Sequence, residues 1–146
     1  MPIKTFVSHR MVKGEDLNHH GTLFAGRTAQ WFVETGFIAA ASATHPKNIL
    51  CLKIHGMLFK KPVQSGSVIR FESRIVHAGT TSLTAFVQVF DSDTDAFLLE
   101  GFITFVHVDE AERPSPHGLV IDASDAENLA LQKRATSLLN PSKRNE

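Results

Sequence analysis

The spacing of hydrophobic and polar residues changes along the chain, and each change marks an expected structural element. Alternation over residues 5–12 predicts a short strand, and the polar, glycine-containing run over 13–21 predicts a loop. Over residues 23–43 the apolar positions recur at helical spacing, so a long helix is expected there. Its buried stripe is predicted to consist mostly of small residues: Phe24, Ala25, Thr28, Ala29, Phe32, Gly36, Ala39 and Ala40. Such a stripe lets the helix approach a neighbouring backbone closely, as it would in the palm of a curved sheet.

Four β-like runs follow the helix and are joined by short polar connections. Pro46 ends the helix, because a proline disfavours the helical conformation of the residue before it. The strands are expected at residues 49–59, 68–78, 82–90 and 97–109. Within the second run, apolar residues alternate with Arg70, Glu72 and Arg74, which is typical of a strand with one buried face. The turns between the later strands are short, so neighbouring strands are predicted to run antiparallel.

The chain is expected to close with a second helix. Residues 123–139 form a moderately amphipathic pattern that ends at Asn140 and Pro141, and the charged tail over 141–146 is expected to fray. The element order is therefore strand, long helix, four strands, terminal helix. This order predicts an α+β fold in which an antiparallel sheet wraps around one long central helix, with a C-terminal helix. No internal repeat or low-complexity segment interrupts it, so a single domain over residues 1–140 is expected.

The composition indicates an ordinary globular domain and narrows the classes of partner. A chain of 146 residues buries about 70% of the surface that its unfolded form exposes, so it needs no disulfide or metal for stability. With 15 Lys and Arg against 15 Asp and Glu, the formal net charge is zero, which does not favour a nucleic-acid partner. Residues 1–12 lack the apolar core of a signal peptide, and no segment is apolar enough to span a membrane. A cytoplasmic protein without membrane contact is expected.

Common catalytic and cofactor motifs are absent from the sequence. There is no Gly-x-Ser-x-Gly, no Walker loop, no His-Glu-x-x-His and no Gly-x-Gly-x-x-Gly. The single cysteine, Cys51, excludes an internal disulfide and lies in an apolar strand run, so a buried core thiol is expected. Of the eight histidines, His19 and His20 are adjacent and the others show no ligand spacing. Neither a metal nor a cofactor is expected.

The candidate chemistry lies where residues 18–26 lead into the long helix. A loop of glycine and small polar residues exposes backbone N–H groups at the positive end of the helix dipole, where they can polarise a carbonyl oxygen. Glu34 follows two turns later, about 180° around the helix from Ala25. Its face mixes polar and large apolar side chains, which indicates contact with a second subunit or a ligand: Arg27, Gln30, Trp31, Phe37 and Ile38. The alternative is a solvated Glu34 carboxylate that is hydrogen-bonded to Gln30.

Four motifs occur in a characteristic order between residues 5 and 110. They are Asn18-x-x-Gly21-x-x-Phe24-Ala25-Gly26, Met57-Leu58-Phe59-Lys60-Lys61-Pro62-Val63-x-x-Gly66, His77-Ala78-Gly79-Thr80-Thr81-Ser82 and Phe102-Ile103-Thr104-Phe105-Val106-His107-Val108-Asp109. Each alone is a weak signal, but jointly they resemble the hotdog-fold acyl-CoA thioesterases, in particular the YciA-type and brain-type acyl-CoA hydrolase branch. The resemblance implies a hotdog fold and hydrolysis of acyl-CoA thioesters to free CoA and a carboxylic acid.

Within that resemblance, three residues match the family's catalytic loop. Asn18 matches the asparagine that holds the thioester or the water, and Ala25 with Gly26 matches the glycine pair whose amides form the oxyanion hole. The family's carboxylate, which acts as base or nucleophile, stands seven residues after the second glycine, where this chain has Val33. Glu34 stands one residue later, which turns its side chain by about 100° in a regular helix. Brain-type relatives carry acidic residues at both positions.

The shifted carboxylate has three interpretations. A local π-bulge or a different helix tilt brings Glu34 into the site, Glu34 acts as general base in a related geometry, or the chain has lost hydrolysis. Glu34 is the expected base, and the alternative is a non-catalytic module that binds acyl-CoA. A hotdog dehydratase is disfavoured, because the histidine motifs of those branches are absent.

The resemblance also implies how CoA and the subunits are held. No separate cofactor is implied, because CoA is part of the substrate, and its phosphates are expected to contact a turn and nearby basic residues. The substrate-binding residues so implied are His20, Lys60, Arg74, Gly79, Thr80, Thr81 and Ser82. The alternative for the last four is that they are ordinary turn residues of a hairpin. Because sites in this family lie between subunits, a homodimer or a higher assembly, such as a tetramer or hexamer, is expected.

Overall fold

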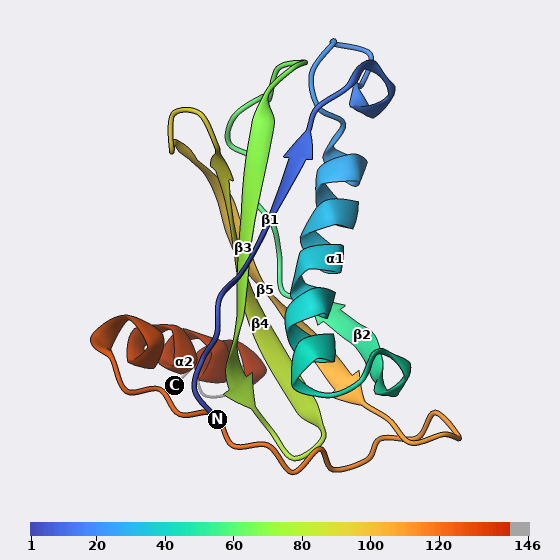
Figure 1. Ribbon diagram of the computed structural model, residues 1–146, viewed down its shortest axis with the longest axis vertical. Helices are drawn as coiled ribbons and strands as arrows, with labels where there is room; N and C mark the ends of the chain where they lie inside the picture. The colour runs from blue at the N-terminus through green and yellow to red at the C-terminus, as the bar shows by residue number, and fades with distance from the viewer. Residues whose placement is uncertain (141–146) are drawn as a thin grey trace.

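Five antiparallel strands form one sheet, and the long helix α1 lies across one of its faces (Figure 1). The computed structural model describes residues 1–140 of the chain, so the expected charged tail at 141–146 lies outside the described residues. The strands are β1 (Phe6–Met11), β2 (Ile49–Ile54), β3 (Val68–Ala78), β4 (Ser82–Asp91) and β5 (Phe97–His107), in the order β1-β3-β4-β5-β2. The helices are α1 (Ala25–Ala43) and α2 (Ala126–Leu139), with short 3-10 helices η1 (Gly14–Asp16) and η2 (Pro46–Asn48).

The sheet separates two apolar cores, because successive residues of each strand point to opposite faces. The larger core lies toward α1 and includes Phe32 of the helix with Phe71 and Phe105 of the strands. On the opposite face, α2 covers a smaller cluster made of Val76, Phe86, Phe102, Leu131 and Ala135. The prediction of an antiparallel sheet wrapped around one long helix, with a C-terminal helix, is confirmed (Figure 1).

The predicted buried stripe of α1 is confirmed for most of its length. Thr28, Phe32, Gly36, Ala39 and Ala40 are buried. The helix approaches the sheet so closely that a Cβ on Gly36 would lie 3.0 Å from Cδ1 of Ile103. The small residues therefore serve the close packing that the sequence pattern indicated.

The prediction is wrong at the helix start and on the second face. Phe24 is 55% exposed and Ala25 is also exposed, because Phe24 precedes the helix with an extended backbone and does not follow its rotation. Trp31 and Phe37, expected on the outer face, pack edge-on against Phe71 and Phe105 respectively. The curved sheet thus covers a wider arc of α1 than one stripe.

The face of α1 that carries Glu34 exposes few large apolar side chains that could contact a second subunit. Ile38 is 45% exposed, and Glu34 lies one turn before it. The sequence-based argument for a contact with a second subunit therefore keeps Ile38 and loses the two aromatic residues.

Strand β2 is shorter and more exposed than expected. It ends at Ile54 rather than residue 59, and the chain leaves the sheet at Gly56, whose φ of +110° favours glycine. Among the described residues β2 pairs only with β5, and Leu52 is 65% exposed. Cys51 is likewise exposed on this edge strand, so the expectation of a buried core thiol is wrong. Partial burial nevertheless raises the pKa of the Cys51 thiol.

The other element ends lie within a few residues of the predicted ones. Strand β3 has the predicted bounds, and β5 ends at His107 rather than residue 109. Helix α2 begins at Ala126 rather than 123, because the Asp125 side chain caps it by accepting a hydrogen bond from the N–H of Asn128 at 2.7 Å. In the part of the chain that the structure describes, no helix is both long and apolar enough to cross a membrane.

Candidate active site

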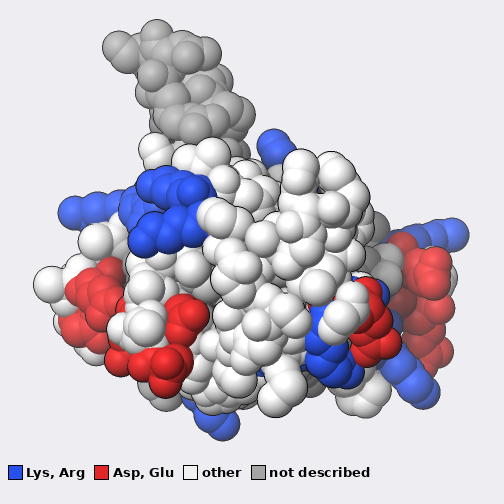
Figure 2. Space-filling view, turned by 90° about the horizontal axis from the view of Figure 1, so that it is seen from above, with Lys and Arg blue, Asp and Glu red and all other residues white. Residues whose placement is uncertain are grey.

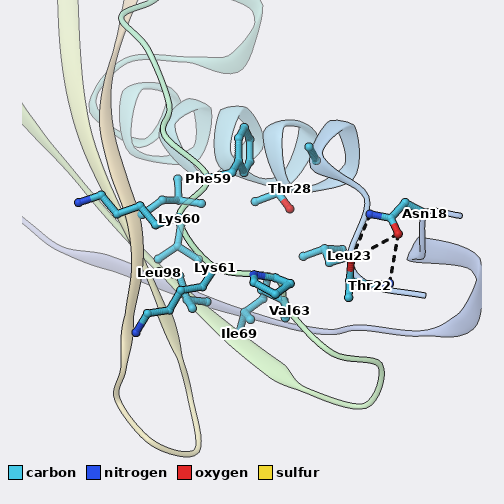
Figure 3. A pocket seen from close by; sticks show the side chains of 14 residues that line it. Asn18, Thr22, Leu23, Thr28, Phe59, Lys60, Lys61, Val63, Ile69 and Leu98 are labelled. Carbon is cyan, nitrogen blue, oxygen red and sulfur yellow. Dashed lines mark hydrogen bonds between the residues drawn. The ribbon is translucent and has the colours of Figure 1, made fainter. Parts of the chain in front are cut away.

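The loop that enters α1 is folded around the side chain of Asn18. Its Oδ1 accepts hydrogen bonds from the backbone N–H groups of His20 at 2.9 Å and Thr22 at 3.2 Å. Its Nδ2 donates to Thr22 Oγ1 at 3.2 Å (Figure 3). Gly21 has a φ of +76°, which favours glycine at this turn. Asn18 thus stabilises its own loop and keeps one amide N–H without a partner in residues 1–140.

The first turn of α1 presents unpaired backbone donors next to this loop. Phe24 occupies the N-cap position and offers no side-chain hydrogen bond. The N–H groups of Ala25 and Gly26 therefore have no hydrogen-bond partner within the described residues. A Cβ at Gly26 would lie 2.5 Å from Cε1 of Phe24, so the Phe24 ring lies directly against this glycine. Two adjacent N–H groups at the positive end of a helix dipole suit an oxygen that gains negative charge.

A cavity of about 250 Å³ opens beside this turn, between α1 and the sheet (Figure 3). Its polar side is lined by Asn18, Thr22, Ala25 and Thr28. Its other lining residues are apolar except for two lysines: Leu23, Phe59, Lys60, Lys61, Pro62, Val63, Ile69, Val89, Leu98 and Leu99. The loop is tied to the segment after β2 by a hydrogen bond of 2.8 Å from the N–H of Leu23 to the carbonyl of Val63.

Glu34 lies in a different groove of the same chain. Arg10 Nη2 contacts its Oε2 at 3.0 Å, and Gln30 Nε2 donates to its Oε1 at 3.2 Å. This groove, of about 400 Å³, also contains Arg27 and Asp16, which are paired at 3.2 Å. Nine residues of α-helix separate Glu34 from Ala25, roughly 13 Å along the axis. One chain therefore does not bring Glu34 to the cavity beside Asn18.

Helix α1 is regular at the position where the family resemblance expects a carboxylate. It is α-helical throughout Ala25–Ala43, so the π-bulge that was one interpretation of Glu34 is absent. Val33, at the expected position, is half-buried and packs against the main core. Neither Asp, Glu nor His is among the described residues that line the cavity.

The remaining predicted residues divide between the cavity and distant places. Lys60 lines the cavity, and His20 belongs to the exposed turn around Asn18. Arg74 lies on the other face of the sheet, where it contacts Glu127 at 2.7 Å. The turn that joins β3 to β4 contains Gly79, Thr80, Thr81 and Ser82 and lies at the end of the sheet away from the start of α1 (Figure 1). The structure thus brings Asn18, Ala25 and Lys60 together, with Gly26 and His20 directly beside them. It places Glu34, Arg74 and the turn over residues 79–82 elsewhere.

The sequence-based prediction missed three polar or charged lining residues: Thr22, Thr28 and Lys61. Thr28 lies one turn after Ala25 on the same side of α1, and that spacing could have identified it. Lys61 follows Lys60 directly in the motif before Pro62. The apolar lining residues of β3, β4 and β5 are distant in sequence, and no local signal distinguishes them from other core residues.

Side chains of both charges occur at the end of the molecule where α1 begins. Seen from above, acidic and basic side chains lie around a broad uncharged area (Figure 2). Lys60 and Lys61 form no ion pair in the described part of the chain, so both remain available to an anion. Within residues 1–140 no three His, Cys, Asp or Glu side chains lie together in a way that could hold a metal ion.

Comparison with known proteins gives a family for this arrangement. A model described as the thioesterase superfamily matches residues 20–97, more than half of the chain. An uncharacterized acyl-CoA thioester hydrolase of Bacillus subtilis, YkhA, is 26% identical over 126 residues, which are 81% of this chain and 73% of that protein. The acyl-CoA thioester hydrolase YciA of Escherichia coli is 28% identical over 89 residues, which are 61% of this chain and 67% of that protein. The resemblance drawn from the four motifs is confirmed.

Solved structures share the fold of this chain. The acyl-CoA hydrolase from Staphylococcus aureus, solved with butyryl-CoA, CoA and CoA disulfide, matches with a TM-score of 0.84 at 23% identity over 97% of this chain and 85% of that chain. An apo hexameric acyl-CoA thioesterase matches with a TM-score of 0.85 at 25% identity over 97% of this chain and 92% of that chain. Alanine variants of the S. aureus hydrolase have been solved at an aspartate, a threonine and an asparagine. The predicted hotdog fold is confirmed.

Proposed function

The chain belongs to the thioesterase superfamily, and from this premise we propose that it is an acyl-CoA thioester hydrolase whose site lies at the start of α1. The observation that carries the proposal is the pair of unpartnered N–H groups of Ala25 and Gly26 beside the cavity that Asn18 lines. Relatives named as acyl-CoA thioester hydrolases support acyl-CoA as the substrate class.

The proposed reaction is attack of water on the thioester carbonyl. The carbonyl oxygen accepts hydrogen bonds from Ala25 and Gly26, which stabilise the negative charge of the tetrahedral intermediate. The free N–H of Asn18 orients the thioester or the attacking water. A carboxylate removes a proton from the water, the carbon–sulfur bond breaks, and that proton passes to the CoA sulfur. The products are free CoA and a carboxylic acid.

The proposed base is Glu34 of a second copy of the chain. No carboxylate within residues 1–140 of the same chain lines the cavity, so a site that uses Glu34 is incomplete in one copy. The Glu34 side chain is 45% exposed, and Arg10 and Gln30 hold its two oxygens in place. A hexameric assembly is known for a structural relative, which supports a homo-oligomer built from dimers.

CoA recognition is proposed for residues of both copies. Lys60 lines the cavity, and His20 lies in the exposed turn that Asn18 stabilises. Both would contact CoA from the same chain. The turn over residues 79–82 lies at the other end of the chain, so its amides and hydroxyls would serve the site of a second copy. Arg74 remains a proposed phosphate ligand only if its 2.7 Å contact with Glu127 opens.

A binding module without hydrolysis is the second candidate, and Val33 is the observation that favours it. In the S. aureus hydrolase the asparagine and aspartate that were replaced by alanine are fifteen residues apart. Fifteen residues after Asn18 this chain has Val33. A chain that keeps the asparagine and lacks the acid would bind the thioester without activating water.

A thiol-release assay distinguishes the two candidates. The hydrolase proposal predicts that acyl-CoA substrates release free CoA thiol in proportion to enzyme concentration. Calorimetric binding of acyl-CoA without any thiol release, at every chain length, would support the binding module instead.

A further inference from the structure

We propose that the cavity beside α1 is an acyl pocket that admits chains of roughly eight carbons, and that Leu98 forms its closed end. This inference rests on the proposed function, because it concerns the substrate of the same site. Its basis is the separation of polar and apolar lining residues, the volume of the cavity and an irregularity in strand β5.

The lining changes from polar to apolar with distance from Asn18. Asn18 and Thr22 lie at one side of the cavity, with the start of α1 beside them (Figure 3). The sheet side is formed by Ile69 and Val89, which are fully buried, and by Leu98, which is nearly so. A thioester held at the helix start would therefore direct its hydrocarbon chain toward the sheet.

The volume limits the length of that chain. A cavity of about 250 Å³ holds roughly eight groups of ~30 Å³, the share of liquid volume that one water molecule, close in size to a methylene, occupies. A longer chain that extends toward the sheet would have to displace close-packed core side chains. A medium-length acyl group is thus the longest that fits without rearrangement.

An irregularity in the β4–β5 pairing directs Leu98 into the cavity. Val89 pairs with Leu99, but Phe90 pairs with Phe97, so Leu98 is an extra residue in β5. Consecutive strand residues normally point to opposite faces, yet Leu98 and Leu99 both belong to the core on the α1 face. A bulge can re-aim a side chain in this way, and here it adds Leu98 to the pocket wall.

The test is a chain-length profile of kcat/KM from acetyl-CoA to palmitoyl-CoA in the thiol-release assay. The proposal predicts a rise of up to about fourfold per added methylene, the effect of burying one such group. The rise should stop near eight carbons. A profile that stays flat, or that rises through sixteen carbons, would overturn the proposal.

Two substitutions locate the end of the pocket. Leu98→Ala removes three carbons and should move the limit by roughly three carbons toward longer chains. Leu98→Phe should move it toward shorter chains. Leu83→Ala is the matched control, because Leu83 is fully buried in the same core and does not line the cavity. Folded Leu98 variants with the wild-type limit would overturn the assignment of Leu98.

Calorimetric binding keeps the two proposals distinguishable. If no acyl-CoA is hydrolysed, the proposed function fails, and the same length profile can still be measured from acyl-CoA dissociation constants. If Leu98→Phe weakens binding of free CoA as much as that of octanoyl-CoA, the cavity holds the pantetheine arm and the acyl-pocket proposal is wrong. An unchanged affinity for free CoA together with a loss for octanoyl-CoA would support it.

Discussion

Asn18 stabilises its own loop and has a proposed role in the reaction, and the two predict separate effects of its removal. Asn18→Ala should lower turnover by about a hundredfold, as for a lost positioning contact. It should also cost about 1–2 kcal/mol of stability, because the N–H groups of His20 and Thr22 lose their acceptor. Thiol release and thermal unfolding measure the two effects. His19→Ala, at an exposed position in the same loop, is the control and should change neither. Wild-type turnover in folded Asn18→Ala would restrict Asn18 to the loop.

Glu34 is the proposed general base, and its replacement by glutamine tests that role. Glu34→Gln should keep acyl-CoA binding and abolish most hydrolysis, because an amide fills the same space but does not accept the proton. Binding is measured by calorimetry and turnover by thiol release. Glu15→Gln is a matched control, since this exposed carboxylate pairs with Lys13 alone among the residues that the structure describes. Full activity of Glu34→Gln in an active wild-type background would exclude Glu34 as the base.

Val33→Asp tests whether the site needs its carboxylate at residue 33 rather than at Glu34. If the site needs its carboxylate there, Val33→Asp raises thiol release, whereas the Glu34 proposal predicts no gain. Val33 packs against the core, so a stability loss of about 1–3 kcal/mol is expected in either case.

At the scale of elements, the segment between β2 and β3 connects the sheet to the candidate active site. It covers the cavity through Phe59 and Val63, and it passes close to β5 at Gly101. A Cβ on Gly101 would lie 2.6 Å from the carbonyl oxygen of Gly56 and 3.0 Å from Cζ of Phe32. Backbone cannot rotate out of such a contact, so the whole segment would have to shift.

Gly101→Ala should therefore cost about 1–3 kcal/mol of stability and lower turnover as well. Denaturant unfolding and thiol release measure the two effects. Gly14→Ala provides the comparison, because a Cβ there meets no atom within 4 Å. An unchanged stability of Gly101→Ala would show that the segment moves freely, contrary to this account.

The sequence predicted those element bounds that depend on local patterns and missed those that depend on tertiary structure. Strand β3 has the predicted bounds because its core residues alternate with Arg70, Glu72 and Arg74, and alternation is visible in sequence. Strand β2 was predicted too long because its apolar run continues after the chain turns at Gly56. Trp31 was misplaced because sheet curvature, a tertiary property, determines how much of α1 is covered.

The candidate site likewise divides into residues that a local motif identifies and residues that only the folded or assembled chain brings together. Asn18 and Ala25 both line the cavity, and Gly26 follows Ala25 in the first turn of α1. These three residues lie close together in sequence, so a local motif was sufficient to identify them. Lys60 was found through its motif. In the proposed site, the place of Glu34 depends on how chains assemble, and no local pattern in a single sequence encodes that assembly.

For the whole molecule, two histidines make stability depend on pH. Burial lowers the pKa of His55 and His77, and His55 contacts Thr104 at 2.7 Å on the α2 face of the sheet. Below about pH 6.5 the unfolded chain therefore binds more protons than the folded chain. The contribution of these two histidines to the free energy of unfolding is fully present above that pH and is lost as the pH falls further. The melting temperature should decrease from pH 7.5 to pH 5.5, and less in His77→Gln. A melting temperature that rises on acidification would contradict this sign.

The central claim is that each active site combines Asn18 of one copy with Glu34 of another. Asn18→Ala and Glu34→Gln chains, each inactive alone, are co-expressed with different tags, and the mixed oligomer is purified for the thiol-release assay. A dimer that carries both tags should regain about half of wild-type turnover, because it holds one intact site of two. In a larger oligomer that assembles at random, only half of the dimers are mixed, so about a quarter is expected. Turnover no higher than that of the separate variants, in oligomers shown by light scattering to be mixed, would contradict the claim.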